Sequence, residues 1–286
     1  MLIREILQKA LDGASLSREE ITSLFRVPLF SEESAMMLAA SRRKSEHAGN
    51  GLAEVHAQVG LNIAPCPRNC SFCSFAAKNK VFTERVEISA EEAVAKAKQL
   101  EGDGANAVYI MSTADYSFEK FVNISREIRK SLRPETVLVA NIGDFTREQA
   151  KKLKDTGFVG IYHAVRLGEG RDTTIPVNKR LMTFKNAREA GLSLGTCVEP
   201  VGNEHSIEEL VEKTIITRDA KPVYSGAARR IPAAGANLLW AEAGANPRDT
   251  EKETEGKRGM TVKECIKVFE EAEWHVLQGP SKFYGA

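Results

Sequence analysis

Three cysteines near the end of the first quarter of the chain have a spacing that suits metal chemistry. Cys66, Cys70 and Cys73 follow the pattern C-x₃-C-x₂-C, whereas Cys197 and Cys265 stand alone far downstream. Three thiolates on one short loop can ligate three irons of a cubane [4Fe–4S] cluster, which leaves the fourth iron without a protein ligand. An iron with an open position can bind and activate a small molecule.

Two closely spaced cysteines also occur in zinc knuckles and in redox thiol pairs. Zinc normally needs a fourth ligand, and His56, the nearest candidate, lies inside a predicted strand. The chain has no second compact C-x₂-C or H-x₃-H pair. The ligand chemistry therefore favours an iron–sulfur cluster. A non-catalytic iron–sulfur or zinc-binding protein is the alternative from another functional class.

The composition is that of an ordinary globular protein. The chain has 286 residues, of which 42% are hydrophobic, and its 40 Lys and Arg nearly balance its 39 Asp and Glu. This balance argues against a general electrostatic footprint for nucleic acid or an anionic membrane. No apolar run is long enough to span a bilayer, and five cysteines are too few for a disulfide framework. These features predict a cytoplasmic protein without nucleic-acid or membrane partners.

Short apolar runs alternate with helical stretches from residue 55 onward. The apolar runs predict strands at 55–63, 107–112, 137–142, 159–164, 193–198, 222–227, 245–248 and 275–277. The stretches between them predict helices at 89–100, 118–132, 147–156, 177–190, 207–218, 238–242 and 261–273. Residues 1–45 show helical patterns only.

Strict alternation of strand and helix favours a parallel sheet with right-handed crossovers. Eight such units in about 240 residues are the size of a closed (β/α)₈ TIM-type barrel of the α/β class. We therefore expect an N-terminal helical extension at 1–45 and a barrel at 46–286. An open doubly wound sheet is the alternative fold.

The cysteine motif, with Phe72 before its last cysteine and a first barrel strand before it, resembles that of the radical S-adenosylmethionine superfamily. In that family the open iron is chelated by the amino and carboxylate groups of S-adenosylmethionine. The reduced cluster cleaves the sulfonium to methionine and a 5′-deoxyadenosyl radical, which abstracts hydrogen from a substrate. The resemblance implies a [4Fe–4S] cluster, S-adenosylmethionine, a small-molecule substrate, an anaerobic reaction and a reducing partner such as ferredoxin or flavodoxin.

Residues 59–63, 199–206 and 243–246 resemble segments of the branch that holds biotin synthase, the radical enzyme of [FeFe]-hydrogenase maturation and methylornithine synthase. Biotin synthase carries an auxiliary cluster on further cysteines at strand ends, but 111–115 and 140–144 lack cysteine and only Cys197 lies near a matching position. One thiolate cannot hold that cluster. A rearrangement, fragmentation or carbon transfer is therefore favoured. Sulfur insertion with a partner or an atypical sulfur source is the alternative.

Polar residues that end the predicted strands would line the mouth of such a barrel. Ser112 and Thr113 follow the second strand, where the family holds the methionyl amino group, although both also suit the cap of the next helix. The loop after the fourth strand carries Arg166, Glu169 and Arg171, which we expect to bind the methionine carboxylate, the ribose or the amino group. A solvated charged loop is the alternative for these three residues.

The remaining expected cofactor contacts are Phe72, Glu199 and Val201, the last against the adenine. Asn141, Tyr162, His163 and Arg230 are the expected substrate contacts, and the basic groups among these candidates favour a small, anionic substrate. A lone histidine on a strand is also a common hydrogen-bonded core residue, and an arginine after the sixth strand is as often a surface residue. No residue is assigned a catalytic proton transfer.

Overall fold

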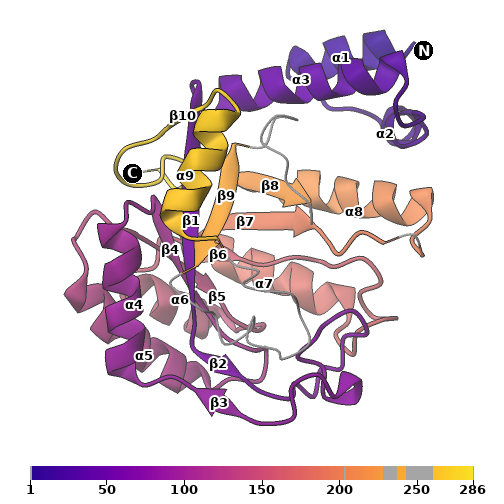
Figure 1. The fold of residues 1–286 in the computed structure, drawn as a ribbon. Helices are drawn as coiled ribbons and strands as arrows, with labels where there is room; N and C mark the ends of the chain where they lie inside the picture. Colours follow the sequence, from indigo (N-terminus) through magenta and orange to yellow (C-terminus); the bar gives the residue numbers. More distant parts are fainter. Residues whose placement is uncertain (1, 203, 228–236, 243–259, 286) are drawn as a thin grey trace.

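Figure 1 shows the fold in the computed structural model, which describes residues 2–202, 204–227, 237–242 and 260–285. Three helices precede the first strand: α1 (Ile3–Leu11), α2 (Arg18–Phe25) and α3 (Glu32–Ala48). Ser17 begins α2 through a capping box with Glu20, whose carboxylate also pairs with Lys9 at 2.8 Å. Arg18 of α2 pairs with Glu212, so these helices contact the barrel as well as one another.

The parallel strands are β1 (Leu52–Gly60), β4 (Ala107–Met111), β5 (Val137–Asn141), β6 (Gly160–Tyr162), β7 (Ser193–Val198), β8 (Tyr224–Ala227), β9 (Leu238–Glu242) and β10 (His275–Val276). Their outer helices are α4 (Ala90–Gly102), α5 (Phe118–Ser131), α6 (Arg147–Asp155), α7 (Val177–Glu189), α8 (Ile207–Asp219) and α9 (Val262–Glu271). A short hairpin of β2 (Asn62–Ile63) and β3 (Val86–Glu87) lies beyond β1 and encloses the 3₁₀ turn η1 (Ala77–Asn79).

The sheet curls into a barrel-like wall with helices on its outer side (Figure 1). Hydrogen bonds join the strands in the order β9-β1-β4-β5-β6-β7-β8, and β10 pairs with the first two residues of β1. Within the described ranges no pairing joins β8 to β9, so the hydrogen-bonded wall is a seven-stranded half-barrel. The predicted α/β barrel architecture is confirmed.

One predicted element is wrong. Residues 238–242 were expected to form a short helix, but they form β9, which pairs in parallel with β1 from Leu238 opposite Glu54 onward. A five-residue apolar run has no distinguishing periodicity, and pairing with β1 decides its conformation. The strand predicted at 245–248 lies outside the described residues.

The inside of the barrel is filled by side chains away from the carboxyl ends of the strands. The hydroxyl of Tyr109 lies 2.8 Å from that of Tyr224 and 2.9 Å from that of Tyr284 in the C-terminal segment. Gly160 leaves room for this tail, because a Cβ there would come within 2.3 Å of the Tyr284 ring. A cavity lies at the other end of the barrel, where the strands lead into their loops.

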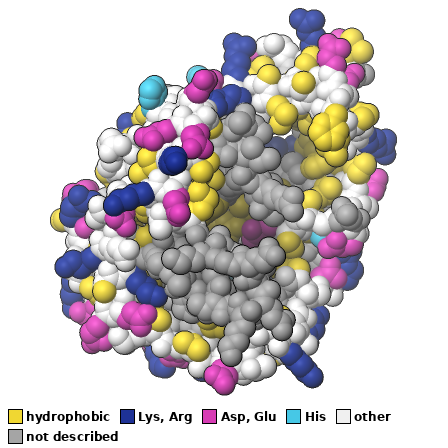
Figure 2. Space-filling model, in the orientation of Figure 1, with side chains coloured by type: hydrophobic (Ala, Val, Ile, Leu, Met, Phe, Trp, Pro, Cys, Tyr) yellow, Lys and Arg dark blue, Asp and Glu magenta, His cyan; other side chains and the backbone are white. Residues whose placement is uncertain are grey.

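Lys and Arg side chains are interspersed with Asp and Glu on the outer surface shown in Figure 2. None of the described helices combines the length and the apolar character needed to cross a membrane.

Candidate functional site

The cysteine loop is held by its own backbone and by the loop that follows β6. Cys66 pairs with the neighbouring turn, its N–H donating to Phe75 O and its carbonyl accepting from Ala77 N. The N–H of Ser71 donates to Asp172 O at 2.8 Å, and Thr174 Oγ1 donates to Arg68 O at 3.0 Å. The loop is thus held both by its own turn and by the loop after β6.

The three thiols line one cavity of about 220 Å³ at the carboxyl ends of β4, β5 and β6. Eleven of the residues expected to contact the cluster, the cofactor or the substrate lie at this cavity. Ten of them line it directly: Cys66, Cys70, Phe72, Cys73, Ser112, Thr113, Asn141, Tyr162, His163 and Arg166. The eleventh, Glu199, reaches it through Arg166, whose Nη2 lies 3.7 Å from Glu199 Oε1. The structure therefore brings together residues from five separate segments of the sequence.

The loop after β4 is fixed by Asn62, which the sequence did not single out. The amide of Asn62 donates to Thr113 Oγ1 at 2.8 Å, and its oxygen accepts from Thr113 N at 2.9 Å. Thr113 in turn donates to Asp115 at 2.7 Å. The hydroxyl of Ser112 differs from that of Thr113, because it is buried and has no hydrogen-bond partner among the described residues. A polar group bound in the cavity would supply one.

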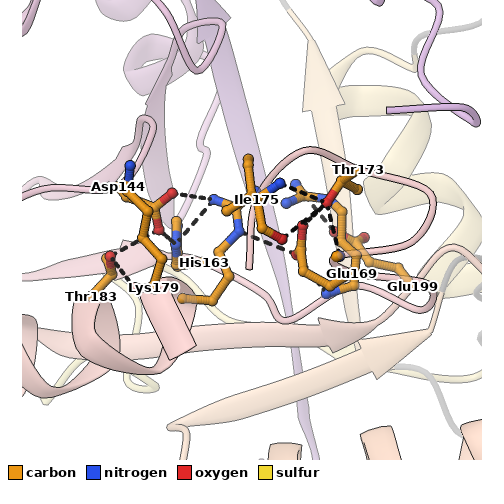
Figure 3. A network of polar contacts seen from close by, with 11 residues as sticks. Asp144, His163, Glu169, Thr173, Ile175, Lys179, Thr183 and Glu199 are labelled. Atoms are coloured by element: carbon orange, nitrogen blue, oxygen red, sulfur yellow. Dashed lines mark hydrogen bonds and ion pairs between the residues drawn. The ribbon is translucent and has the colours of Figure 1, made fainter. Parts of the chain in front are cut away.

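A buried arginine from α7 lies beside the cavity. Arg180 Nε lies 3.2 Å from Glu169 Oε2 and its Nη1 lies 3.1 Å from Asp144 Oδ2, so it joins the loops after β5 and β6. Figure 3 shows these two acids, Asp144 and Glu169, on opposite sides of one network of polar contacts. Its side chain is 3% exposed and still contributes to the cavity wall. Thr173 donates to the other oxygen of Glu169 at 2.6 Å, and Thr183 donates to Asp144 at 2.9 Å. Both carboxylates are therefore satisfied within the protein.

His163 shares this network. Its Nε2 lies 3.0 Å from Asp144 Oδ1 and 3.3 Å from Arg180 Nη1. Burial lowers the pKa of His163 below its ordinary value of 6.5, although Asp144 opposes the shift. Burial would raise the pKa of Asp144, but its hydrogen bonds and the nearby Arg180 outweigh burial and lower that pKa well below its usual range. An ionised Asp144 beside a neutral His163 is the arrangement at neutral pH.

Arg166 reaches the cavity from the loop after β6. Burial disfavours its charged form, but the Glu199 carboxylate and other nearby acids outweigh burial and raise its pKa above the ordinary value. The backbone N–H of Arg166 donates to Glu169 Oε2 at 3.0 Å. The turn that follows uses Gly168 at φ +68°, a conformation that side chains with a Cβ rarely adopt.

Three other expected contacts lie elsewhere. Glu169 is buried behind the wall, where Arg180, Thr173 and the Arg166 backbone occupy its oxygens. Arg171 is exposed and pairs with Asp172 at 2.9 Å and with Glu209. Val201 is 49% exposed and does not line the cavity. Arg230 lies outside the described residues. The predicted direct contacts of these residues with cofactor or substrate stay predictions.

The donor set fits an iron–sulfur cluster. Burial raises the pKa of the Cys66 and Cys70 thiols, so they deprotonate most readily when a metal binds. Within the described ranges, no three His, Cys, Asp or Glu side chains lie close enough together to hold one metal ion. All three thiols line the same cavity, and the unpartnered Ser112 hydroxyl marks room for a polar ligand beside them.

Sequence reasoning missed Asn62, Arg68, Asp144 and Arg180. Asp144 follows a strand end, a signal that could have found it. Arg180 lies inside α7, and no local sequence pattern indicates that its side chain is buried. Only the packing of α7 against the loops places it beside the cavity. Arg68 lies between two motif cysteines and lines the cavity, and its side chain makes no ion pair with a described residue.

The family model described as the radical SAM superfamily matches residues 64–214, which is more than half of the chain. This segment begins just before the cysteine loop and extends into α8. It therefore contains every residue that lines the cavity.

Among curated proteins, the biotin synthase of Nitrosopumilus maritimus is 28% identical over 204 residues, which cover 68% of this chain and 61% of that protein. The biotin synthase of Desulforudis audaxviator is 25% identical and is covered over 60% of its length. The matched part of the chain thus spans about three fifths of these relatives.

Among solved structures, methylornithine synthase (PylB) superposes with a TM-score of 0.79 at 15% identity, over 96% of this chain and 97% of that one. The [FeFe]-hydrogenase maturase HydG from Carboxydothermus hydrogenoformans gives a TM-score of 0.68 at 18% identity, over 95% of this chain and 78% of that one. These likenesses support the fold.

Proposed function

Because this chain belongs to the radical S-adenosylmethionine superfamily, whose cofactors are a [4Fe–4S] cluster and S-adenosylmethionine, we propose that it removes hydrogen from a small, anionic substrate. The outcome we propose is a rearrangement, a fragmentation or a carbon transfer. The observation that carries the proposal is one cavity lined by the three motif thiols and by the guanidinium groups of Arg166 and Arg180.

When bound, the cluster and S-adenosylmethionine supply reductive sulfonium cleavage and the organic radical that abstracts hydrogen. Cys66, Cys70 and Cys73 would hold the cluster. Their thiols must lose protons as the metal binds, since thiolates are the ligating form. The hydrogen bonds between the cysteine loop and the loop of Asp172 keep the thiols against the cavity.

Arg166 and Arg180 would bind carboxylate groups, because a planar guanidinium fork matches a carboxylate in two parallel hydrogen bonds. Arg180 already uses Nε and Nη1 for Glu169 and Asp144, so these acids fix its orientation toward the cavity. Ser112 would contribute a hydroxyl to the cofactor. The partners of Thr113 hold the backbone of this loop in place.

The rest of the wall would contact the substrate. Tyr162, His163 and Asn141 present polar groups from the ends of β5 and β6. Arg68 adds a positive charge that no described carboxylate neutralises, which favours an anionic substrate group. Burial raises the pKa of Tyr162 well above its ordinary value, so its phenol stays protonated.

The named relatives include biotin synthases, but the positions of the other cysteines do not favour sulfur insertion. Cys197 lies buried on β7 and Cys265 lies buried on α9, far along the chain from the motif. Burial raises the pKa of Cys265 to about 12, which keeps it a thiol. A chemistry that needs only the motif cluster is therefore preferred.

Anaerobic reconstitution with iron and sulfide, followed by reduction in the presence of S-adenosylmethionine, tests the proposal. We expect 5′-deoxyadenosine and methionine. Adding small deuterated carboxylic and amino acids one at a time should then identify the substrate class through deuterium in the 5′-deoxyadenosine. A fully reconstituted protein that forms no 5′-deoxyadenosine with any reductant would overturn the assignment.

A further inference from the structure

The loop that carries the motif cysteines has positive charge that its own sequence does not compensate. Residues 64–83 include Arg68, Lys78 and Lys80 and contain no Asp or Glu, although the whole chain has 40 basic and 39 acidic residues. Lys78 and Lys80 are exposed, and neither lines the cavity. Neither ammonium group lies within ion-pair distance of a carboxylate in the described part of the chain.

Nearby carboxylates are occupied by other cations. Asp172, whose charge interacts with that of Lys78, pairs with Arg171 at 2.9 Å. Glu87 pairs with Lys120 at 3.0 Å, and Asp115 lies 3.4 Å from Arg85. Glu84, the first acid after the cysteine loop, is exposed. The two lysines therefore present net positive charge to solvent.

Hydrogen bonds join the turn that carries both lysines to the cysteine loop. Asn79, which lies between them, donates through its amide to Cys73 O at 2.9 Å and to Ser71 O at 3.1 Å. The N–H of Lys78 donates to Asn69 Oδ1 at 3.0 Å. The turn that carries both lysines is thus held against the segment of the motif cysteines.

We propose that Lys78 and Lys80 form the docking face for an acidic, one-electron carrier protein that reduces the cluster. This proposal rests on the proposed function, which consumes one electron from outside the chain for each S-adenosylmethionine cleaved. The carrier is oxidised by one electron, the cluster is reduced by one, and no proton or bond is exchanged between the two proteins. Two lysines are too few for nucleic-acid binding, which neutralises many phosphates, whereas complementary charge is enough to steer an acidic protein.

Exposed apolar side chains flank this face. Phe72 is 38% exposed between two motif cysteines, and Val81 is 41% exposed directly after Lys80. A charged patch with apolar groups within it is typical of protein interfaces, where charge orients the partner and apolar area stabilises the contact.

The test compares a protein donor with a small chemical one. In K78E/K80E, we expect electron transfer from reduced flavodoxin to slow about tenfold or more at low ionic strength, because the electrostatic steering of the acidic partner is lost. The rate of flavodoxin reoxidation measures this transfer. The rate of 5′-deoxyadenosine formation with dithionite should stay within about twofold of the unmodified protein. The rate of electron transfer from flavodoxin to the neutral K78Q/K80Q variant should lie between the rates for K78E/K80E and for the unmodified protein. The difference between variants should shrink as salt is added.

The matched control, K98E/K151E, reverses the charge of two exposed lysines on outer helices, Lys98 of α4 and Lys151 of α6. This variant should keep both the rate of electron transfer from flavodoxin and the rate of 5′-deoxyadenosine formation with dithionite. Binding of oxidised flavodoxin, measured by titration calorimetry, should weaken in K78E/K80E alone. Equal losses with flavodoxin and dithionite, or an unchanged flavodoxin rate and affinity, would overturn the docking face. An unmodified protein that forms no 5′-deoxyadenosine with either donor would instead refute the proposed function.

Discussion

Arg180 and Glu169 form a buried ion pair behind the cavity wall, with Nε 3.2 Å from Oε2 and the carboxylate fully shielded from solvent. The pair joins helix α7 to the loop that also carries Arg166. Removing one partner of a buried pair leaves an uncompensated charge, which is more costly than losing the pair's net attraction.

We therefore expect Glu169→Gln to lower the free energy of unfolding by about 3 kcal/mol, the lower end for a broken buried pair because Arg180 keeps Asp144. Urea denaturation of the metal-free protein measures this. Glu209→Gln, at the exposed partner of Arg171, should change stability little, since exposed ion pairs contribute little and glutamine keeps the helix cap. Equal effects of the two substitutions would contradict the structural role assigned to Glu169.

The two arginines of the loop after β6 should differ in cofactor binding. Arg166 lines the cavity, whereas Arg171 is exposed and paired outside it. A hydrogen bond to a charged group contributes about 1.5–3 kcal/mol, so Arg166→Ala should weaken S-adenosylmethionine binding roughly ten- to a hundredfold. Arg171→Ala should leave it unchanged. Equilibrium binding to the reconstituted protein measures both, and normal binding by the Arg166 variant would assign Arg166 to the substrate or to structure.

The motif cysteines should be individually essential. Replacing Cys66, Cys70 or Cys73 by Ala removes one of three cluster ligands, and we expect loss of the cluster and of 5′-deoxyadenosine formation. Cys197→Ala is the control and should keep about four irons per chain, the content of one cubane. Iron and sulfide analysis with absorption spectroscopy measures this. Excess iron that disappears in the Cys197 variant would reveal an auxiliary cluster.

Two buried serine hydroxyls, those of Ser112 and Ser125, have no hydrogen-bond partner among the described residues. Ser112 faces the cavity, and Ser125 lies on α5 against the core. Because a buried unsatisfied group costs about 1–3 kcal/mol, Ala at either position should keep or raise the stability of the metal-free protein. Only Ser112→Ala should weaken ligand binding, by roughly two- to tenfold for one neutral hydrogen bond. Equal ligand affinity in both variants would remove Ser112 from the site.

The stability of the protein should fall as the pH drops below about 6.5, the ordinary pKa of histidine. Burial lowers the pKa of His163 in the folded state, so over this range the unfolded chain binds a proton that the folded protein does not. Glu54 and Asp144 also have lowered pKa values, but their effect on stability is centred at lower pH, below their ordinary pKa values of 4.5 and 3.8. Urea titrations at pH 7 and pH 5 should show a smaller loss of stability in His163→Asn than in the unmodified protein.

Local sequence determined much of the fold and of the cluster site. The thiols that would hold a cluster lie within eight residues, so local sequence was enough to favour an iron–sulfur cluster over a zinc site. The helices capped by Ser17, Ser89 and Ser206 are recognisable from local sequence, because the capping side chain accepts a hydrogen bond from the backbone N–H three residues later. Strand ends such as Asn141 and Tyr162 lie at the cavity because parallel strands all point their carboxyl ends to one side.

Tertiary structure decided the features that depend on contacts between distant segments. The conformation of residues 238–242 followed from pairing with β1, which a five-residue pattern does not encode. The different roles of Arg166, Arg171 and Arg180 followed from the carboxylate that the fold brings to each guanidinium. These carboxylates come from the loop after β7, from α8 and from the loop after β6, respectively. Side-chain charge is visible in a sequence, but its burial and its partners are set only when the chain closes around them.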